Sequence, residues 1–447
     1  MDWGSFLLPW TVIYLAVWAG TLALPEDVRK RVAWLPVIAA GVVLGLQTSA
    51  DPGQKLIAGS LFLLLMIKGT VLLSTASLRR GSWLIPYLSF WPGIEVSSFD
   101  RRKEPTEQDV NGFSTGWALM LLGVIAFASL AMFGRGLHAW MLGALSVVAL
   151  IVAIHFGASQ VLTCCMRLMR FPVSDLFDRP TTSRRLSEFW SRRWNIPFVD
   201  MNRLLLMPWA TRLLARRAWI VAFLASGLLH EVAISYPAGK GYGLPFAYFV
   251  LQAGLIAFER RARIRSRAWV VLAVLLPAPM LFHPPFLESV VAPLVIKVGG
   301  GLTHLLDSLS PETYIIALGA LTLLPVLASS QVPKQLKWRE ELGRMSSLNS
   351  KLMWVYGGFI VLMILAQGVF LLTFPSEIVA GSPVALAVVG FCALFWSARL
   401  VIDLFVFKPT DWPAGAALNV GRTLLNTLFV VLAVSYPAVI IWATASN

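Results

Sequence analysis

Long apolar runs separated by shorter polar stretches dominate the chain. Most runs extend for about 20 residues, the length that a helix needs to cross the hydrocarbon core of a bilayer. They lack the short alternating pattern of membrane β-strands. Because only helices and closed barrels satisfy their backbone hydrogen bonds in lipid, the pattern predicts an all-α polytopic membrane protein. Twelve spans are expected, at residues 3–24, 32–50, 56–78, 113–133, 138–160, 218–236, 244–258, 268–282, 313–330, 352–374, 383–407 and 423–443.

Three stretches need separate interpretation. The run 3–24 has no basic residues before it and is too long for a signal-peptide core, so it is predicted to be a retained span. Ser82–Trp91 is apolar but too short to span, which predicts an interfacial or re-entrant helix. Residues 286–303 are weakly apolar and contain three consecutive glycines, which predicts a module boundary near residue 305. The expected organisation is a domain over 1–304 followed by a four-helix membrane module over 305–447.

Composition agrees with a membrane protein and suggests its orientation. Of the 447 residues, 57% are hydrophobic and only 13% are charged, against about a quarter in soluble proteins. Of the 37 Lys and Arg residues, 31 fall in one alternate set of loops and 4 in the other. Basic loops face the cytoplasm, so both termini are predicted to be non-cytoplasmic. This distribution also explains the net charge of +14 without nucleic acid as a partner.

Cysteine and histidine spacing argues against metal or disulfide chemistry. The three cysteines form neither a disulfide framework nor a metal-binding spacing. None of the five histidines belongs to a His-x-x-x-His pair, so we expect no metal and no bound cofactor.

The longest polar gap, residues 167–217, contains a basic and aromatic block, Ser187–Pro197. A helix is predicted to start near Ser183, and it places Leu186, Phe189, Trp190 and Trp194 on one face. An amphipathic helix at the membrane surface, without chemistry, would show the same periodicity.

A second block, Ser226-Gly-Leu-Leu-His-Glu231, lies inside a predicted span. His230 and Ser226 share one helix face, and Gly227 permits close approach of another helix or a ligand chain. A buried neutral imidazole is suited to accept the proton of an attacking alcohol. The alternative is a structural histidine bonded to Glu231 or to a backbone carbonyl. His138, His155, His283 and His304 lack a comparable context and are interpreted as structural.

The basic block offers polar partners for His230. Asn195 can orient an acyl carbonyl or donate to a developing oxyanion. Alternatively, it is a capping residue before Ile196-Pro197, where the helix must end. Arg192 and Arg193 can contact the phosphates of an acyl carrier, or they can anchor the chain to lipid headgroups.

Taken together, these two blocks resemble the wax-synthase branch of the membrane-bound O-acyltransferases, which carries Phe-Trp-x-Arg-Arg-Trp-Asn followed by Ser-Gly-x-x-His-Glu. Leu281-Phe-His-Pro-Pro-Phe286 is similar to a later segment of that family. The resemblance covers about residues 1–300 and implies a multi-helix fold with an internal tunnel, His230 and Asn195 as catalytic residues, and acyl-CoA as co-substrate. Under that resemblance the expected substrate-binding residues are Arg192, Arg193, Trp190, Trp194, Ser226 and Glu231.

The sequence therefore predicts an enzyme of a bacterial inner membrane that transfers a long acyl chain from acyl-CoA to a long-chain alcohol. Arg193 stands where the sterol and diacylglycerol branches carry an Asp, which argues against those branches. A sterol-like, glyceride or sugar hydroxyl stays open as the acceptor. A proton-coupled transporter using the His230–Glu231 pair is a more distant alternative.

Overall fold

The computed structural model describes residues 8, 11–12, 15–16, 19–20, 23–36, 38–39, 51–74, 84–407 and 412–446. These residues form helices and loops, with no strand among them. Within this part of the chain, nine helices are long and apolar enough to cross a membrane. The protein is therefore an integral, all-helical membrane protein. Most of the predicted spans 3–24 and 32–50 lies outside the described residues.

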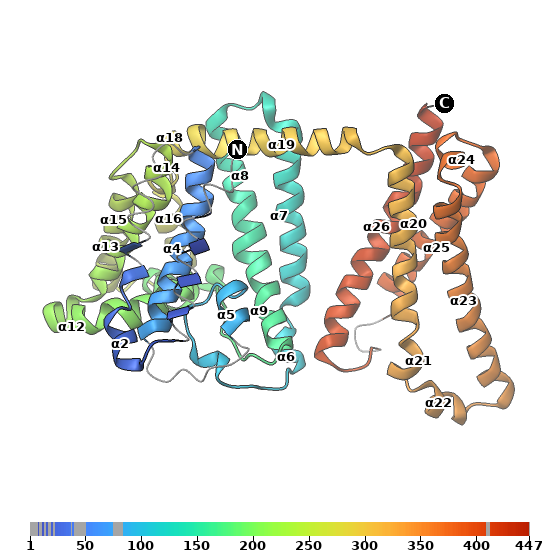
Figure 1. Ribbon diagram of the computed structural model, residues 1–447, viewed down its shortest axis with the longest axis horizontal. Coiled ribbons are helices and arrows are strands. Elements are labelled where there is room, and N and C mark those ends of the chain that lie inside the picture. Colours follow the sequence, from blue (N-terminus) through green and yellow to red (C-terminus); the bar gives the residue numbers. More distant parts are fainter. Residues whose placement is uncertain are drawn as a thin grey trace. The chain divides into compact units, whose positions relative to one another are not determined.

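The chain divides into two compact units. The first comprises Met1–Pro105 and Thr115–Leu302, and the second comprises Thr106–Ser114 and Thr303–Asn447. The helices up to residue 168, shown in Figure 1, are α2 (Glu26–Arg31), α4 (Pro52–Ser74), α5 (Leu84–Ser89), η1 (Ser97–Phe99), α6 (Glu107–Val110), α7 (Phe113–Phe133), η2 (Gly134–Gly136), α8 (Ala139–Leu150), the π-helix η3 (Ile151–Ala158) and α9 (Ser159–Leu168).

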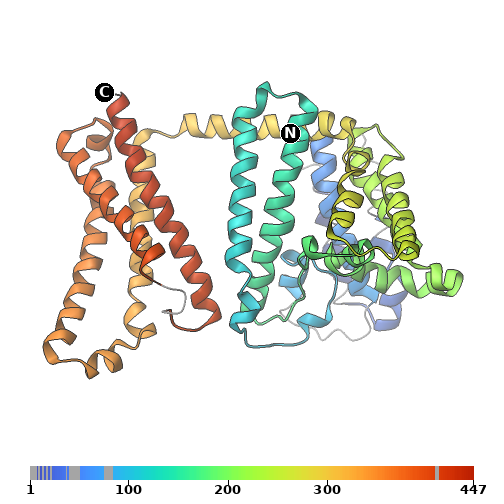
Figure 2. The ribbon, with the colours of Figure 1, turned by 180° about the vertical axis from the view of Figure 1, so that it is seen from behind.

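Helices α8, η3 and α9 form one continuous rod that packs along α7 (Figure 2). Small residues permit this close packing: a Cβ atom at Gly123 would lie 2.6 Å from the carbonyl oxygen of Ala149, and one at Gly157 would lie 2.7 Å from the Cβ of Met120. Close backbone approach through glycine is the usual way in which membrane helices associate. The rod carries His155 at its middle, in the π-helical segment.

The short segment predicted over Ser82–Trp91 forms a helix only at Leu84–Ser89, among its described residues 84–91. Helix α5 is too short to cross a bilayer. Lys68 of α4 is buried at 1% exposure, and its ammonium contacts the carbonyl oxygens of Tyr87 and Trp91. The lysine thus donates to carbonyl groups in α5 and just after its end.

The polar gap folds into short helices and turns rather than one long amphipathic helix. Helix α12 carries Leu213, 72% exposed, next to arginines, as expected of a helix at a membrane surface. The elements are η4 (Pro180–Thr182), α10 (Leu186–Glu188), the π-helix η5 (Phe189–Arg193), α11 (Ile196–Met201), the π-helix η6 (Asn202–Leu206), α12 (Met207–Leu214) and η7 (Ala215–Arg217).

The remaining helices of the first unit surround this segment. Gly227 of α13 lies against α15, where a Cβ atom would come 3.0 Å from the Cα of Phe246. The elements are α13 (Trp219–His230), the π-helix η8 (Glu231–Ser235), α14 (Tyr236–Ala238), α15 (Leu244–Ala262), α16 (Arg267–Leu275), α17 (Ala278–Leu281), α18 (Pro284–Phe286), the π-helix η9 (Leu287–Val291) and α19 (Ala292–Ser308), which extends beyond the first unit at Leu302.

The glycine run 299–301 lies inside a helix. Residues Pro284–Ser308 form one continuous helical stretch. Glycine weakens a helix by about 1 kcal/mol per residue, but tertiary packing overrides that preference. A Cβ atom at Gly299 would lie 2.0 Å from the carbonyl oxygen of Ala131, so glycine is required where α19 meets α7. Both ribbon views show α19 running crosswise to α7 and α8 (Figures 1 and 2).

Two of the predicted spans are not among the candidate membrane helices. The predicted spans 244–258 and 268–282 correspond to α15 and to the short apolar stretch Arg267–Leu281, neither of which is among the nine candidates. Helix α15 ends in Glu259, Arg260 and Arg261, which shortens its apolar part. Among the described residues nine candidates are found, one of which, Pro284–Ser308, was not predicted as a span. The expectation of about twelve spans is not tested, because two of the predicted spans lie mostly outside these residues.

The second unit is a bundle of long helices with a continuous apolar core. A hydrogen bond of 2.8 Å between Thr322 and Tyr436 crosses this core. The loop segment Thr106–Ser114 joins the bundle, because Glu107 accepts the Gly415 N–H at 2.7 Å. The elements are α20 (Pro311–Ser329), α21 (Val332–Gln335), α22 (Trp338–Glu341), η10 (Leu342–Arg344), α23 (Ser347–Thr373), α24 (Pro375–Val379), α25 (Pro383–Phe405) and α26 (Ala416–Ser446).

Candidate functional site

A cavity of about 620 Å³ lies within the first unit. Its volume falls in the range of about 300–1,000 Å³ that is typical of small-molecule sites. The walls are mainly aliphatic and aromatic, and they come from η3, the segment between residues 180 and 207, and helices α13, α15, α16 and α17. Three charged residues line it, all arginines: Arg203, Arg260 and Arg267. The cavity therefore suits a ligand with a long apolar part and an anionic part.

His230 lines this cavity from the last position of α13. Its Nδ1 lies 2.7 Å from the carbonyl oxygen of Ser226, one helical turn earlier. A carbonyl oxygen can only accept, so we assign the ring proton to Nδ1, which leaves a lone pair on Nε2. The ring packs against Phe249, with 4.5 Å between centroids. The backbone bond and this ring contact hold the imidazole in the form and position of a proton acceptor.

Asn195 lines the same cavity. Its backbone has a left-handed conformation (φ 47°), which Asn adopts more readily than most residues. Its Oδ1 accepts the N–H of Phe198 at 3.3 Å and so caps α11. Asn195 therefore caps the start of the helix that follows it, and not the end of a helix as the sequence suggested. Its Nδ2 has no protein partner among the described residues. The amide keeps two N–H groups that can serve a ligand.

Trp190, Trp194 and Ser226 also lie in the cavity wall. Trp190 donates its indole N–H to Gln252 of α15 at 3.0 Å, and Gln252 donates to the carbonyl of Ala273 in α16 at 2.8 Å. This chain of bonds fixes the wall formed by η5 to two neighbouring helices. Sequence reasoning therefore placed three of its substrate-binding candidates at the cavity.

Glu259 anchors the basic block, and the sequence analysis did not identify it. It is 2% exposed, at the end of α15. Its carboxylate accepts the backbone N–H groups of Leu186 and Ser187, the Ser187 hydroxyl at 2.9 Å and the Trp269 indole N–H at 3.1 Å. These bonds satisfy the first N–H groups of α10, which lack partners within the helix. An acidic residue at the end of an apolar run was the available signal.

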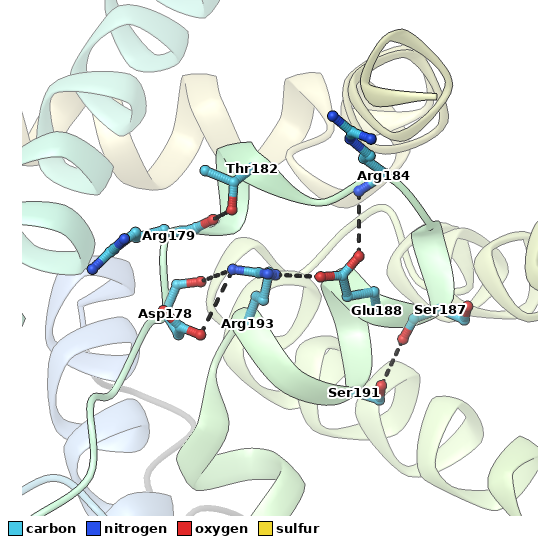
Figure 3. Close-up of polar contacts among 8 residues, drawn as sticks. All are labelled: Asp178, Arg179, Thr182, Arg184, Ser187, Glu188, Ser191 and Arg193. Atoms are coloured by element: carbon cyan, nitrogen blue, oxygen red, sulfur yellow. Dashed lines mark hydrogen bonds and ion pairs between the residues drawn. The ribbon is translucent and has the colours of Figure 1, made fainter. Parts of the chain in front are cut away.

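Arg192 and Arg193 do not line the cavity. Arg193 forms an ion pair with Glu188 at 2.7 Å and another with Asp178 at 3.6 Å, and it donates to the Asp178 carbonyl at 3.2 Å (Figure 3). The hydrogen bond from Arg193 lowers the pKa of Glu188 below its ordinary value. Arg192 is exposed. Arg193 therefore links Asp178 to Glu188 and stabilises the turn between residues 178 and 193. Its guanidinium group already has these protein partners.

Glu231 also does not line the cavity, although it follows His230 directly. Its Oε1 accepts the N–H groups of Gly243 and Phe246, at 3.0 and 2.9 Å, at the start of α15. Successive residues on a helix project in different directions, so neighbours in sequence need not share a site. The structure thus separates the His230–Glu231 pair that the sequence suggested.

A second histidine, His155, lies in the cavity wall. Its ring stacks on Trp194, with 5.7 Å between centroids and 7° between planes, and meets the edge of Phe177 at 5.1 Å. The sequence analysis treated His155 as structural, because an isolated histidine in an apolar run has no motif around it. By contrast, His283 is fully buried and caps α18, accepting the Phe286 N–H at 3.2 Å.

Among the described residues, no group of three or more His, Cys, Asp or Glu side chains is arranged to hold a metal ion.

Comparison with known families gives one match. Residues 173–251 match the model of the family described as Membrane bound O-acyl transferase. The matched region contains Asn195 and His230 but not His155. No curated protein matches the chain. This part of the chain is therefore similar to the membrane-bound O-acyltransferases.

Proposed function

We propose that this protein transfers a long-chain acyl group from acyl-CoA to the hydroxyl of a long-chain alcohol or a similar lipid, with His230 as general base. The observation that carries the proposal is the position of His230: its Nδ1 proton is held by the Ser226 carbonyl, and its ring lines a mainly apolar cavity. The acyltransferase domain is proposed to span residues 1–304, with 305–447 as an appended membrane module. A bacterial inner membrane with both termini non-cytoplasmic is part of the same proposal.

The reaction follows from the groups in the cavity. The lone pair on Nε2 of His230 accepts the alcohol proton as the oxygen attacks the thioester carbon. The Asn195 N–H groups donate to the carbonyl oxygen as it becomes negative. The acyl chain fills the apolar part of the cavity, where the aromatic walls exclude water. The ester product is uncharged and can leave into lipid.

The proposed site for the CoA phosphates differs from the one inferred from sequence. Arg203, Arg260 and Arg267 line the cavity and are exposed, so they lie where it meets the surrounding medium. Arginine forks bind phosphates through paired hydrogen bonds. By the charge distribution of the loops, these residues face the cytoplasm, where acyl-CoA is found. Arg193 is committed to Glu188 and Asp178. Arg203 also has a carboxylate partner, Asp200, at 3.0 Å. We therefore reassign phosphate binding to Arg260 and Arg267.

The test uses the full chain in lipid nanodiscs with radiolabelled acyl-CoA and a panel of long-chain alcohols, sterols, diglycerides and sugars. Ester formation and free thiol release are measured for the wild type, His230→Ala and the matched control His304→Ala, whose side chain is exposed on α19. The proposal requires His230-dependent ester and thiol in equal amounts. Equal ester formation by the wild type and His230→Ala would refute the mechanism, and the preferred acceptor identifies the hydroxyl.

A further inference from the structure

Two imidazoles line the same cavity, one from each of two long helices. His230 comes from α13, and His155 comes from the π-helical middle of the rod formed by α8, η3 and α9. π-Helical segments inside α-helices occur frequently at functional sites. The family match begins at residue 173, so it assigns nothing to His155. Any role for His155 therefore has to come from its own surroundings.

The surroundings give the two rings opposite hydrogen-bonding patterns. His230 donates from Nδ1 to the Ser226 carbonyl, so its Nε2 is an acceptor. Nδ1 of His155 is buried and has no hydrogen-bond partner within the described part of the chain. A proton on that nitrogen would be a buried hydrogen-bond donor without an acceptor, which is a rare arrangement in proteins. We therefore assign the proton of His155 to Nε2, which is not among the buried atoms without a partner.

Aromatic contacts fix the direction of the His155 ring. Trp194 lies parallel to it at 5.7 Å, and Phe177 meets it edge-on at 5.1 Å. Trp194 also stacks on Phe189 at 5.4 Å, so the ring belongs to a packed aromatic wall. The next residue after Trp194 is Asn195, whose Nδ2 has no hydrogen-bond partner in the described part of the chain. The wall thus brings two uncharged N–H donors, one imidazole and one amide, to the same cavity as the proton acceptor.

We propose that His155 is a second hydrogen-bond donor of the acyl-transfer site, with its Nε2–H directed at the carbonyl oxygen of the acyl group. This proposal rests on the proposed function above. It divides the chemistry between two histidines: His230 moves the proton, and His155 stabilises the negative oxygen without giving up its own proton.

The bond changes balance as follows. The alcohol O–H bond breaks, its proton passes to Nε2 of His230, and the alcohol oxygen forms a bond to the thioester carbon. The carbonyl electron pair moves onto oxygen, which accepts the hydrogen bonds of His155 and Asn195. When the carbonyl reforms, the carbon–sulfur bond breaks and the thiolate takes the proton from His230. Both histidines then return to their starting forms.

The test compares three replacements of His155 in the full chain in nanodiscs. His155→Phe keeps a ring against Trp194 but removes the donor, His155→Leu is a second donor-free variant, and His155→Gln restores an N–H. Loss of one such donor typically lowers kcat by about 10²–10³-fold. We expect that loss for His155→Phe and His155→Leu, with the KM for acyl-CoA nearly unchanged, and partial recovery for His155→Gln.

A binding measurement separates this role from a structural one. An S-alkyl-CoA keeps the long hydrocarbon chain but lacks the thioester carbonyl oxygen. Its Kd should therefore be the same for the wild type and His155→Phe. Turnover of His155→Phe within about threefold of the wild type overturns the proposal, because a lost donor predicts about 10²-fold or more. Parallel loss of S-alkyl-CoA binding and turnover also overturns it, because that indicates lost packing. Absence of any His230-dependent transfer in the wild type removes the proposed function itself, and this inference with it.

Discussion

The helices of the first unit are repeatedly interrupted, whereas those of the second run unbroken. The π-helical segments η3, η5, η6, η8 and η9 all belong to the first unit. In the second unit, α23 extends over 27 residues and α26 over 31. An interrupted helix turns side chains away from a regular apolar face, and the cavity with its two histidines lies among these interruptions. Irregular backbone thus marks the part of the molecule where chemistry is expected.

The largest expected effect contrasts one substitution in each unit. His230→Ala removes the proposed base and should lower turnover by about 10²–10⁴-fold. Tyr436→Phe, in the core of the second unit, should leave turnover per folded molecule unchanged, because its hydroxyl bonds only within that bundle. Ester formation normalised to folded protein checks both. A comparable loss of turnover in Tyr436→Phe would show that the chemistry depends on the second unit as well.

The next effect concerns the anchor of the basic block. Glu259→Ala leaves the N–H groups of Leu186, Ser187 and Trp269 without their acceptor. Unpaired buried donors destabilise by about 1–3 kcal/mol each, so we expect a loss of about 3 kcal/mol and reduced transfer. Thermal unfolding in nanodiscs measures the stability. Glu340→Ala, at an exposed position of the short helix α22 in the second unit, is the matched control, and an equal loss there would contradict the assignment.

A smaller effect separates two groups of arginines. Arg260→Gln, at the cavity, should raise the KM for acyl-CoA about tenfold, which corresponds to about 1.4 kcal/mol of phosphate binding. Arg192→Gln, outside the cavity, should leave this KM unchanged. Steady-state kinetics at fixed acceptor concentration distinguishes the two. Reversed results would return phosphate binding to the site inferred from sequence.

A still smaller effect tests the packing of the second unit. Thr322→Val removes one partner of the 2.8 Å bond to Tyr436. Hydrogen bonds between membrane helices contribute about 0.6 kcal/mol on average, so stability should fall by about that amount. A double-mutant cycle with Tyr436→Phe measures the coupling between the two hydroxyls. A coupling of zero would show that the bond contributes nothing.

The smallest effect is the acid dependence of the Arg193–Glu188 pair. Arg193 lowers the pKa of Glu188 in the folded protein, so the pair stabilises above the ordinary carboxyl pKa. This contribution is lost as the pH falls through the lowered pKa. The difference in stability between the wild type and Arg193→Gln should therefore be constant near neutral pH and shrink in acid. Screening by solvent keeps it small. A difference that grows in acid would contradict the sign.

Local patterns in the sequence were sufficient for much of the fold. The predicted span 113–133 coincides with α7, and the helical spacing of Ser226 and His230 is realised in their hydrogen bond. Both features depend only on periodicity within one helix. By contrast, Pro197 was interpreted as the point where a helix must end, whereas it lies in the first turn of α11, the helix that Asn195 begins.

Features that depend on distant packing were not predictable. The glycine run 299–301 is helical because Gly299 meets Ala131, a partner far away in sequence. Arg193 and Glu231 were expected to bind substrate, but Arg193 pairs with Glu188, and Glu231 accepts backbone N–H groups at the start of α15. His155 joins the site only because its helix lies against Trp194. The sequence therefore identifies functional residues within one segment, but not residues that are distant in the sequence and close together in the fold.

The left-handed backbone of Asn195 determines which substitution can test this position. Alanine would disturb the turn and the cap together with any chemistry, so a dead alanine variant would be uninformative. Aspartate preserves the shape and the capping oxygen while exchanging an amide for a carboxylate. The exchange of asparagine for aspartate, and not its truncation to alanine, therefore isolates the contribution of the amide nitrogen. Because the turn and the cap also favour asparagine, its retention among relatives would not by itself prove a catalytic role.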